Sequence, residues 1–316
     1  MPKCIEMFAG CGGMTQGFVD AGWDVSCVEM NKDACDAHER NIPSVSIYQH
    51  RSTEEQPLPT ELEEGNVDAI IGGPPCQSFS HAGAQRGAAD PRNGIPAFLS
   101  AIKKLEPRCV VMENVAALCG GKHVHVLTAL VHELQALDYK VNYRVLVASD
   151  YGVAQKRRRV ILLASKLFLP SFPPATTVTP RTVQDALGAA AFTTHDESLM
   201  LTAKQDAYVA RYETVSKCKN PRDLLPSRPA RTLTCTNLAC ATGDMLRLKL
   251  VDGARRQLSI EEAALLQGFD TRHSFPYSRR TAMRLIGNAF PPPVACALAK
   301  HLRSQLETVH RAEGII

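Results

Sequence analysis

The feature that most constrains this fold is a regular alternation of short apolar runs with amphipathic stretches in the first half of the chain. The apolar runs predict strands over Cys4–Ala9, Asp24–Met30, Val67–Ile71, Arg108–Met112, Tyr143–Ala148 and Arg159–Ala164. The stretches between them predict helices over Met14–Ala21, Lys32–Arg40, Pro96–Leu105 and Val124–Leu137. Such alternation builds an α/β domain whose mostly parallel sheet has helices on both faces. Ligands bind these sheets beyond the carboxyl ends of the strands.

The pattern changes near Leu169, where residues 169–180 are rich in proline and threonine and are typical of a linker or a domain edge. The residues that follow, to about Arg280, have weaker periodicity and more basic charge. An apolar helical pattern returns over Gly287–Leu302. We therefore predict a larger domain formed by residues 1–168 and 284–316, and a smaller domain formed by residues 169–283.

Composition excludes several classes of protein. No apolar run approaches the roughly 20 residues that span a bilayer, and the N-terminus lacks the basic start and apolar core of a secretion signal. We therefore expect an intracellular protein with no membrane partner. The eleven cysteines are irregularly spaced and include no pair of Cys-x-x-Cys units, so we expect free thiols and no metal site.

Basic residues gather between Lys217 and Arg256, although the net charge of the whole chain is only +4. This stretch has nine basic residues and three acids, which leaves +6. The basic residues are Lys217, Lys219, Arg222, Arg228, Arg231, Arg247, Lys249, Arg255 and Arg256. A clustered positive surface suits a polyanion, although an ordinary solvated face would give the same pattern.

A glycine-rich turn, Phe8-Ala-Gly-Cys-Gly-Gly13, follows the first predicted strand and precedes a helix. Glycines let the backbone turn tightly and approach a ligand closely, and the free N–H groups of the helix suit an anion. Glu29 ends the second strand, where a carboxylate can accept both hydroxyls of a ribose. Alternatively, Glu29 is an acid at the start of a helix that begins at Asn31.

Three further segments carry side chains suited to catalysis. Cys76 follows two prolines in Gly72-Gly-Pro-Pro-Cys76, a rigid frame that favours an exposed nucleophile over a buried thiol. Glu113 ends the next strand and would lie beside Cys76 if the two strands are neighbours; its carboxyl group could then bind a pyrimidine ring nitrogen. Gln155-Lys-Arg-Arg-Arg159 is by itself typical of a basic turn, and Gly287-Asn288 of a helix start.

Together and in this order, these segments resemble the cytosine-C5 DNA methyltransferase family. The resemblance runs from Cys4 to about Ser165 and from about Arg228 to Leu302, and the pair Pro74-Pro75-Cys76-Gln77 and Glu113-Asn114-Val115 is its most specific part. It implies a Rossmann-like fold that binds S-adenosylmethionine (SAM), with a smaller DNA-recognition domain. The implied cofactor-binding residues are Phe8, Ala9, Gly10, Cys11, Gly12, Gly13, Glu29, Met30, Pro75 and Asn288.

The resemblance also implies the reaction, which is methylation of cytosine C5 through a Cys76 adduct at C6 of a flipped-out base. The implied catalytic residues are Cys76, Glu113, Arg157 and Arg159. Glu113 would bind N3 and the amino group, Arg157 would contact the base carbonyl, and Arg159 would pack nearby. The composition of residues 80–94, rich in glycine and alanine, favours a loop that closes over the base, with a plain surface loop as the alternative. We expect double-stranded DNA as the substrate and a monomeric enzyme, in a restriction-modification, viral or eukaryotic setting.

This chain departs from the family pattern in two places, and two other functions stay open. Where the family has an acid that contacts the SAM adenine, this chain has Gln49 or His50, and its recognition region is short. A loop over Thr234–Asp244, with Thr236, Asn237 and Thr242, would read the bases, although these polar residues would equally suit an ordinary turn. The alternatives are a methyltransferase of transfer RNA cytosine and a non-catalytic DNA-binding relative.

Overall fold

The computed structural model describes residues 1–75, 93–215, 217, 222–239 and 243–312. They form two compact units. The first comprises the described parts of Met1–Val147, Arg158–Pro174 and Pro292–Ile316, and the second those of Ala148–Arg157 and Ala175–Pro291. Residues 148–157 and 284–291 thus belong to the second unit, whereas the predicted domain boundaries assign them to the larger domain. The functional division into catalytic and recognition domains stays a prediction.

A seven-stranded sheet with the order β3-β2-β1-β4-β5-β8-β6 forms the centre of the first unit. Its strands are β1 (Lys3–Met7), β2 (Asp24–Glu29), β3 (Ser46–Gln49), β4 (Ala69–Gly72), β5 (Cys109–Val115), β6 (Lys140–Val147) and β8 (Arg158–Ser165). Strands β1 to β5 are parallel, and β8 is antiparallel to β5 and β6, which confirms the mostly parallel sheet. Periodicity misses β3, an edge strand with no fully buried residue.

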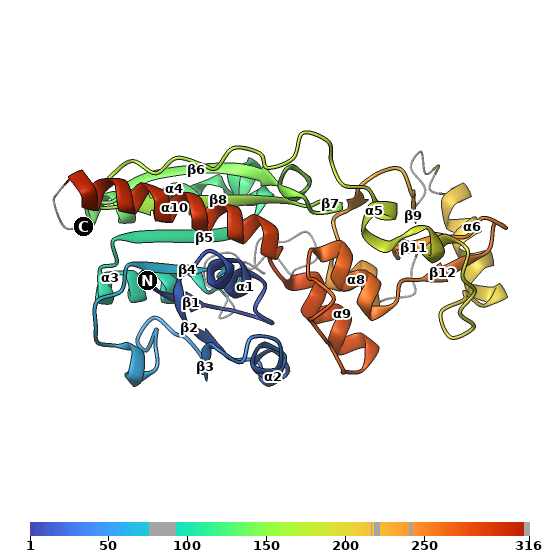
Figure 1. The fold of residues 1–316 in the computed structure, drawn as a ribbon, viewed down its shortest axis with the longest axis horizontal. Coiled ribbons are helices and arrows are strands. Elements are labelled where there is room, and N and C mark those ends of the chain that lie inside the picture. Colours follow the sequence, from blue (N-terminus) through green and yellow to red (C-terminus); the bar gives the residue numbers. More distant parts are fainter. Residues whose placement is uncertain (76–92, 216, 218–221, 240–242, 313–316) are drawn as a thin grey trace. The chain divides into compact units, whose positions relative to one another are not determined.

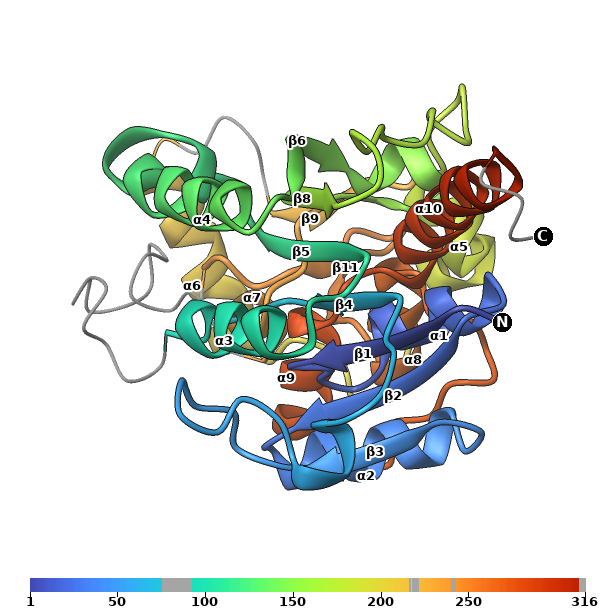
Figure 2. The same cartoon turned by 90° about the vertical axis from the view of Figure 1, so that its left-hand side faces the viewer.

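Helices cover both faces of this sheet. They are α1 (Gly13–Asp20), α2 (Lys32–Asn41), α3 (Ile95–Leu105), α4 (Val124–Ala136) and α10 (Pro292–Ala312), with short 3-10 helices at Thr60–Leu62, Ala116–Cys119 and Gly121–His123. Figure 2 shows α3 and α4 on one face, and α1 and α10 on the other. None of the described helices is both long and apolar enough to cross a membrane.

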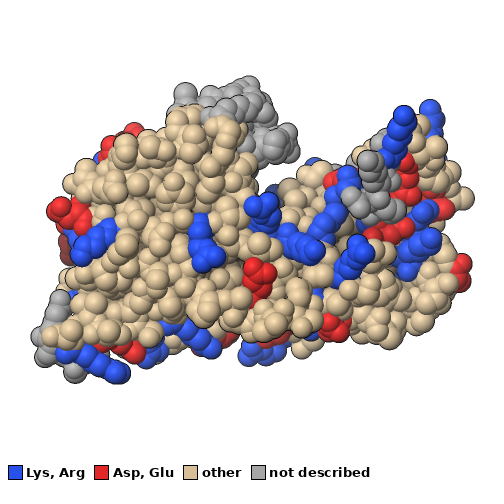
Figure 3. Space-filling model, turned by 90° about the horizontal axis from the view of Figure 1, so that it is seen from above, with Lys and Arg blue, Asp and Glu red and all other residues tan. Residues whose placement is uncertain are grey.

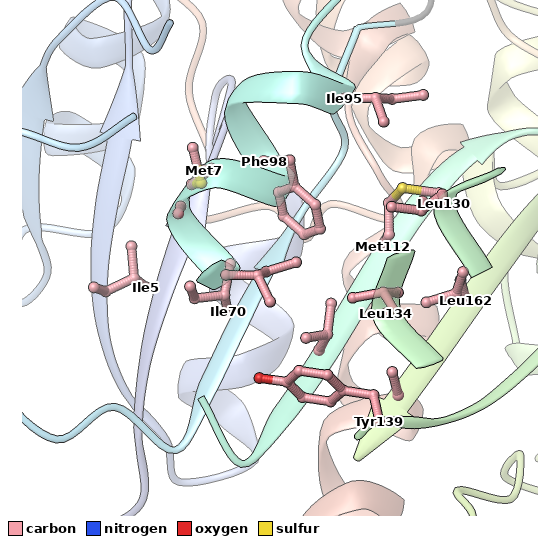
Figure 4. Close-up of a cluster of buried hydrophobic side chains, with 14 of the residues drawn as sticks. Ile5, Met7, Ile70, Ile95, Phe98, Met112, Leu130, Leu134, Tyr139 and Leu162 are labelled. Atoms are coloured by element: carbon pink, nitrogen blue, oxygen red, sulfur yellow. The ribbon is translucent and has the colours of Figure 1, made fainter. Parts of the chain in front are cut away.

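The main core lies between the sheet and helices α3 and α4. Ile5 and Met7 of β1 pack there with Met112 of β5, against Phe98 of α3 and Leu134 of α4 (Figure 4). Side chains alternate between the two faces of a strand. The side chains of Cys4 and Glu6 therefore point to the opposite face, where Glu6 contacts Thr15 of α1.

The second unit contains two small sheets and several short helices (Figure 1). The strands are β7 (Gln155–Lys156), β9 (Asp223–Leu224), β10 (Ala230–Arg231), β11 (Arg247–Lys249) and β12 (Arg255–Gln257); β7 pairs with β10, and β11 lies between β9 and β12. The helices are α5 (Val183–Leu187), α6 (Ala203–Val215), α7 (Cys235–Ala239), α8 (Ile260–Gln267) and α9 (Arg279–Asn288), with 3-10 helices at Ala148–Tyr151 and Ala189–Phe192.

The predicted helix over Gly287–Leu302 begins at the wrong residue. Helix α9 ends at Asn288, and α10 begins only at Pro292 and continues to Ala312. Three successive prolines, residues 291–293, explain the interruption. Proline lacks the N–H that a helix interior needs, but it suits the first turn, where that N–H has no helical partner.

Candidate active site

The carboxyl ends of β1, β2, β4 and β5 lie at one edge of the first unit's sheet, because these strands are parallel. Strand β8 is antiparallel to β5, so its first residues lie at the same edge, and Val115 pairs there with Arg159. The glycine-rich turn, Glu29, the start of the Cys76 loop, Glu113 and Arg159 therefore meet at one edge. This is the edge at which such sheets bind ligands.

The glycine-rich turn has the conformation that its residues allow. The backbone φ is 57° at Gly10 and 90° at Gly12, values that glycine adopts readily. Phe8 also has a positive φ of 60°, which ends β1 at Met7 rather than at Ala9. A Cβ atom on Gly10 would meet nothing within 4 Å, so this part of the turn is open to a ligand.

Glu29 supports the turn with both carboxyl oxygens. Its Oε2 accepts a hydrogen bond from Gly10 N at 2.9 Å, and its Oε1 accepts one from Asn31 N at 2.8 Å. Asn31 caps α2 as expected, since its side chain accepts from Ala34 N. Carboxylate oxygens have further lone pairs, so Glu29 can hold the turn and still accept ligand hydroxyls. The neighbouring Met30 is 62% exposed, which leaves an apolar side chain open beside the turn.

The two candidate contacts for the SAM adenine differ in what surrounds them. Gln49 is exposed at the end of β3, whereas the His50 ring contacts the carbonyl of Gln56 at 3.1 Å. Gln49 is therefore the better placed of the two to contact a ligand.

A buried polar network lies beneath the turn, and motif comparison misses it. The Thr15 hydroxyl donates to Glu6 Oε2 at 2.6 Å and contacts His38 Nε2 at 3.0 Å. Burial raises the pKa of Glu6 to about 8 and lowers that of His38 to about 4, so both groups are uncharged at neutral pH. A Cβ atom on Gly12 would lie 2.9 Å from the His38 ring, so the network packs directly against the turn. The sequence contains one indication of this network, which is an acidic residue within the buried strand β1.

Glu113 and Arg159 form an ion pair at the same edge. Arg159 Nε lies 2.7 Å from Glu113 Oε1, and both side chains are largely buried. The other carboxyl oxygen, Oε2, lies 3.0 Å from the position of a Cβ atom on Gly73. The Glu113 carboxyl group therefore lies on the backbone that leads into the Cys76 loop.

Asn114 fixes the beginning of that loop. Its buried side chain donates to Pro74 O at 3.0 Å and accepts from Val115 N at 2.9 Å. Pro75 O accepts from Gly94 N at 3.0 Å, which joins the two ends of the loop. Cys76 itself, and the predicted closing segment 80–94 except for its last two residues, lie outside the described residues.

Arg157 has surroundings that differ from those of Arg159. It belongs to the second unit, is 2% exposed, and donates through Nη1 to Leu233 O and Gly287 O. This burial argues against the expected contact between Arg157 and a base, and gives the side chain a role in holding two backbone segments together. Asn288 also lies in the second unit, exposed at the end of α9, and its cofactor contact stays a prediction.

Most arginines between Lys217 and Arg256 form ion pairs within the second unit, so the formal charge of this stretch overstates the positive charge that a polyanion would meet. Arg247 is fully buried between Glu213 and Asp223, and Arg256 forms two hydrogen bonds with Glu262. Three further ion pairs are Arg222–Asp244, Arg231–Asp244 and Arg255–Asp206. On the face drawn in Figure 3, acidic side chains accordingly lie among the basic ones over this unit. Lys219 lies outside the described residues.

Of the three residues proposed to read bases, Thr236 is exposed, Thr242 lies outside the described residues, and Asn237 has surroundings that argue against a contact with bases. The side chain is 4% exposed, and it accepts from Thr234 N at 2.8 Å and donates to Thr232 O at 3.0 Å. Asn237 therefore stabilises the backbone at the start of α7.

No group of His, Cys, Asp and Glu within the described ranges could hold a metal ion.

This fold, with a glycine-rich turn and an acid on the next strand, is that of a SAM-dependent methyltransferase. The model of the family "C-5 cytosine-specific DNA methylase" matches residues 2–304, and the chain belongs to that family. It is therefore a DNA cytosine-C5 methyltransferase whose cofactor is SAM.

The similar proteins agree with this assignment. Type II methyltransferase M.AplI of Arthrospira platensis is 40% identical over 309 residues, covering 96% of this chain and 86% of that protein. Type II methyltransferase M1.HphI of Haemophilus parahaemolyticus is 31% identical over 317 residues, covering 94% and 85%. Among solved structures, the Dnmt2 methyltransferase of S. pombe has the same fold, with a TM-score of 0.74, 18% identity and coverage of 97% and 99%.

Proposed function

We propose that this chain methylates cytosine within a defined short sequence of double-stranded DNA, as a monomer inside the cell, with Cys76 as the nucleophile. The observation that carries the proposal is the Glu113–Arg159 ion pair, which lies against Gly73, three residues before Cys76. The names of the relatives, type II methyltransferases, support a role in site-specific DNA modification.

Carbon 5 of cytosine is a weak nucleophile until a thiolate adds to carbon 6. Addition of the Cys76 thiolate forms a C6–S bond and moves the electron pair of the C5–C6 double bond to C5, which becomes nucleophilic. After methyl transfer, a base removes the C5 proton, the double bond reforms and the C6–S bond breaks. Cys76 leaves as a thiolate, so the enzyme is restored.

Glu113 and Arg159 would bind and polarise the base. Arg159 holds Glu113 Oε1, which orients the carboxyl group and leaves Oε2 toward the Cys76 loop. That oxygen can accept a hydrogen bond from the cytosine amino group or, when protonated, donate one to N3. We assign the contact with the base carbonyl to Arg159 rather than to Arg157, whose side chain is buried.

The turn Phe8–Gly13, with Glu29, Met30 and Pro75, would hold SAM. These residues fit a nucleoside cofactor, because the turn is open at Gly10, Glu29 has lone pairs left for ribose hydroxyls, and Met30 is exposed. Ala9 and Cys11 are buried, so they would contribute backbone groups. When bound, SAM supplies the electrophilic methyl group.

Carbon 6 cannot be reached inside a stacked duplex. The target base must therefore be flipped out, at a cost of a few kcal/mol. A duplex containing 5-fluorocytosine tests this mechanism, since fluorine at C5 cannot leave as a proton does and the covalent adduct persists. We expect mass spectrometry to find the adduct on Cys76 after incubation with SAM, and Cys76→Ser to abolish both the adduct and methyl transfer.

The matched control is Cys119→Ser, which changes a partly exposed cysteine elsewhere in the first unit and should leave the adduct intact. Transfer RNA serves as the second substrate. An adduct on another cysteine would refute the assignment of Cys76, and methylation of transfer RNA in place of duplex DNA would refute the proposed substrate.

A further inference from the structure

Helix α6 places its charged residues on two opposite sides. Lys204, Tyr208, Arg211 and Val215 follow one another at spacings of four, three and four residues, so they fall within about 60° around the helix axis. All four are exposed, Tyr208 by 51% and Val215 by 75%. These four residues form the outer stripe of α6.

The acids of α6 lie on the other side and are neutralised there. Asp206 pairs with Arg255 at 2.9 Å, and Glu213 pairs with the buried Arg247 at 2.5 Å. Val209 is the only described residue of α6 that is fully buried, and it lies between these two acids on the helix surface. Ion pairs thus link α6 to strands β11 and β12, in addition to the packing of Val209 and of the Tyr212 ring against Gly243.

This arrangement turns a helix of balanced charge into one with a positive outer face. Its two acids are paired with arginines of β11 and β12, whereas no described acid forms an ion pair with Lys204 or Arg211. Helix α6 itself provides no acidic partner for them either, because the residues three and four positions from Lys204 and Arg211 are all uncharged. An ordinary solvated helix face carries both signs of charge, and the outer stripe carries one.

We propose that the outer stripe of α6 binds the sugar–phosphate backbone of the duplex DNA substrate. Lys204 and Arg211 lie about 10 Å apart along the helix, which is about three base-pair rises measured along the duplex axis. The Tyr208 hydroxyl between them can donate a hydrogen bond to a phosphate oxygen. The inference rests on the proposed function, because it assigns to the DNA substrate a contact surface in the second unit in addition to the catalytic edge of the first unit.

Backbone contacts position a duplex without reading its sequence. The stripe should therefore contribute equally to binding of target and non-target DNA. Each phosphate that a side chain neutralises contributes about −0.9 to the slope of log K against log salt concentration. Removal of two cations should reduce the magnitude of that slope by about 2.

The test compares the wild type with Lys204→Ala/Arg211→Ala, using fluorescence anisotropy with two duplexes, with and without the target sequence, over a range of salt concentrations. We expect the variant to lose affinity for both duplexes by the same factor and to show the smaller slope. In methylation assays, KM for DNA should rise, while kcat at saturating DNA and KM for SAM stay unchanged. The control Lys300→Ala/Arg311→Ala, two exposed cations of α10 in the first unit, should leave the slope unchanged.

Three outcomes would overturn the inference. An unchanged slope would show that α6 does not contact phosphates, and an acidic protein partner would then be the better occupant of the stripe. Loss of affinity for the target duplex alone would show that α6 reads bases. If the wild type neither binds nor methylates duplex DNA, the proposed function is refuted as well. If the wild type does both and only the salt slope is unchanged in the variant, the α6 contact alone is refuted.

Discussion

Replacing the buried carboxyl group of Glu6 with an amide should change how the stability of the first unit depends on pH. Burial raises the pKa of Glu6 from 4.5 to about 8, against the opposing hydrogen bond from Thr15. Between these two values the folded state keeps a proton that the unfolded chain releases. The stability that Glu6 contributes is therefore complete below pH 4.5 and is lost as the pH rises toward 8. The loss amounts to about 1.4 kcal/mol per pH unit.

His38 acts in the opposite direction over a different range. Burial lowers its pKa from 6.5 to about 4, so the unfolded chain binds the additional proton and stability rises with pH between these values. The two effects offset each other between about pH 4.5 and 6.5, and above that range Glu6 alone of this pair lowers stability. Because glutamine does not ionise, the difference between Glu6→Gln and the wild type isolates the Glu6 contribution.

We expect the free energy of unfolding of Glu6→Gln, relative to the wild type, to rise by about 4 kcal/mol between pH 5 and 8. Urea unfolding at four pH values would measure it, followed by the fluorescence of Trp23, the one tryptophan of the chain, which is buried in the first unit. The control Glu61→Gln changes an exposed carboxyl group and should give a constant difference. A difference for Glu6→Gln that is equal at pH 5 and pH 8 would refute the reasoning.

Three other substitutions test separate parts of the structure. Glu29→Ala should weaken SAM binding roughly ten- to hundredfold by calorimetry and leave duplex binding intact; unchanged SAM affinity would make Glu29 purely structural. Gly17→Ala would put a Cβ atom 2.4 Å from Ala295 Cβ, so it should destabilise the packing of α1 on α10 by about 1–3 kcal/mol. A melting temperature equal to that of the wild type would contradict this expectation. Asn237→Ala should cost about 1–3 kcal/mol without changing which cytosines bisulfite sequencing finds methylated; altered sites would restore its role in reading bases.

Local patterns were enough to predict every strand of the sheet except β3, and the position of its ligand-binding edge. Strand periodicity depends on residues two apart, and the Gly10 turn and the prolines before Cys76 act on their own backbone, so these features can be recognised in a short stretch of sequence. Their shared edge follows from the parallel direction of the strands that precede them. The resemblance to a family then added the reaction and the cofactor, which no periodicity contains.

Partners far apart in the chain could not be derived in this way. Arg159 lies beside Glu113 only because β8 runs antiparallel to β5, and Arg157, two residues earlier, belongs to the second unit and is buried. Both residues belong to one basic segment, and the sequence does not distinguish their environments. The proposal that Arg159, rather than Arg157, contacts the base rests on that difference.

The sequence by itself determined the fold class, the cofactor-binding turn and the candidate nucleophile, because each depends on backbone preferences and spacings within a few residues. Only the tertiary structure decided which charges are available. Arg247 and Arg255 pair with Glu213 and Asp206 across the contact between α6 and its sheet, so these two cations are neutralised, whereas Lys204 and Arg211 of α6 stay exposed. The physical reason is that a charge acts through its distance to its partners and its exposure to water, and folding sets both.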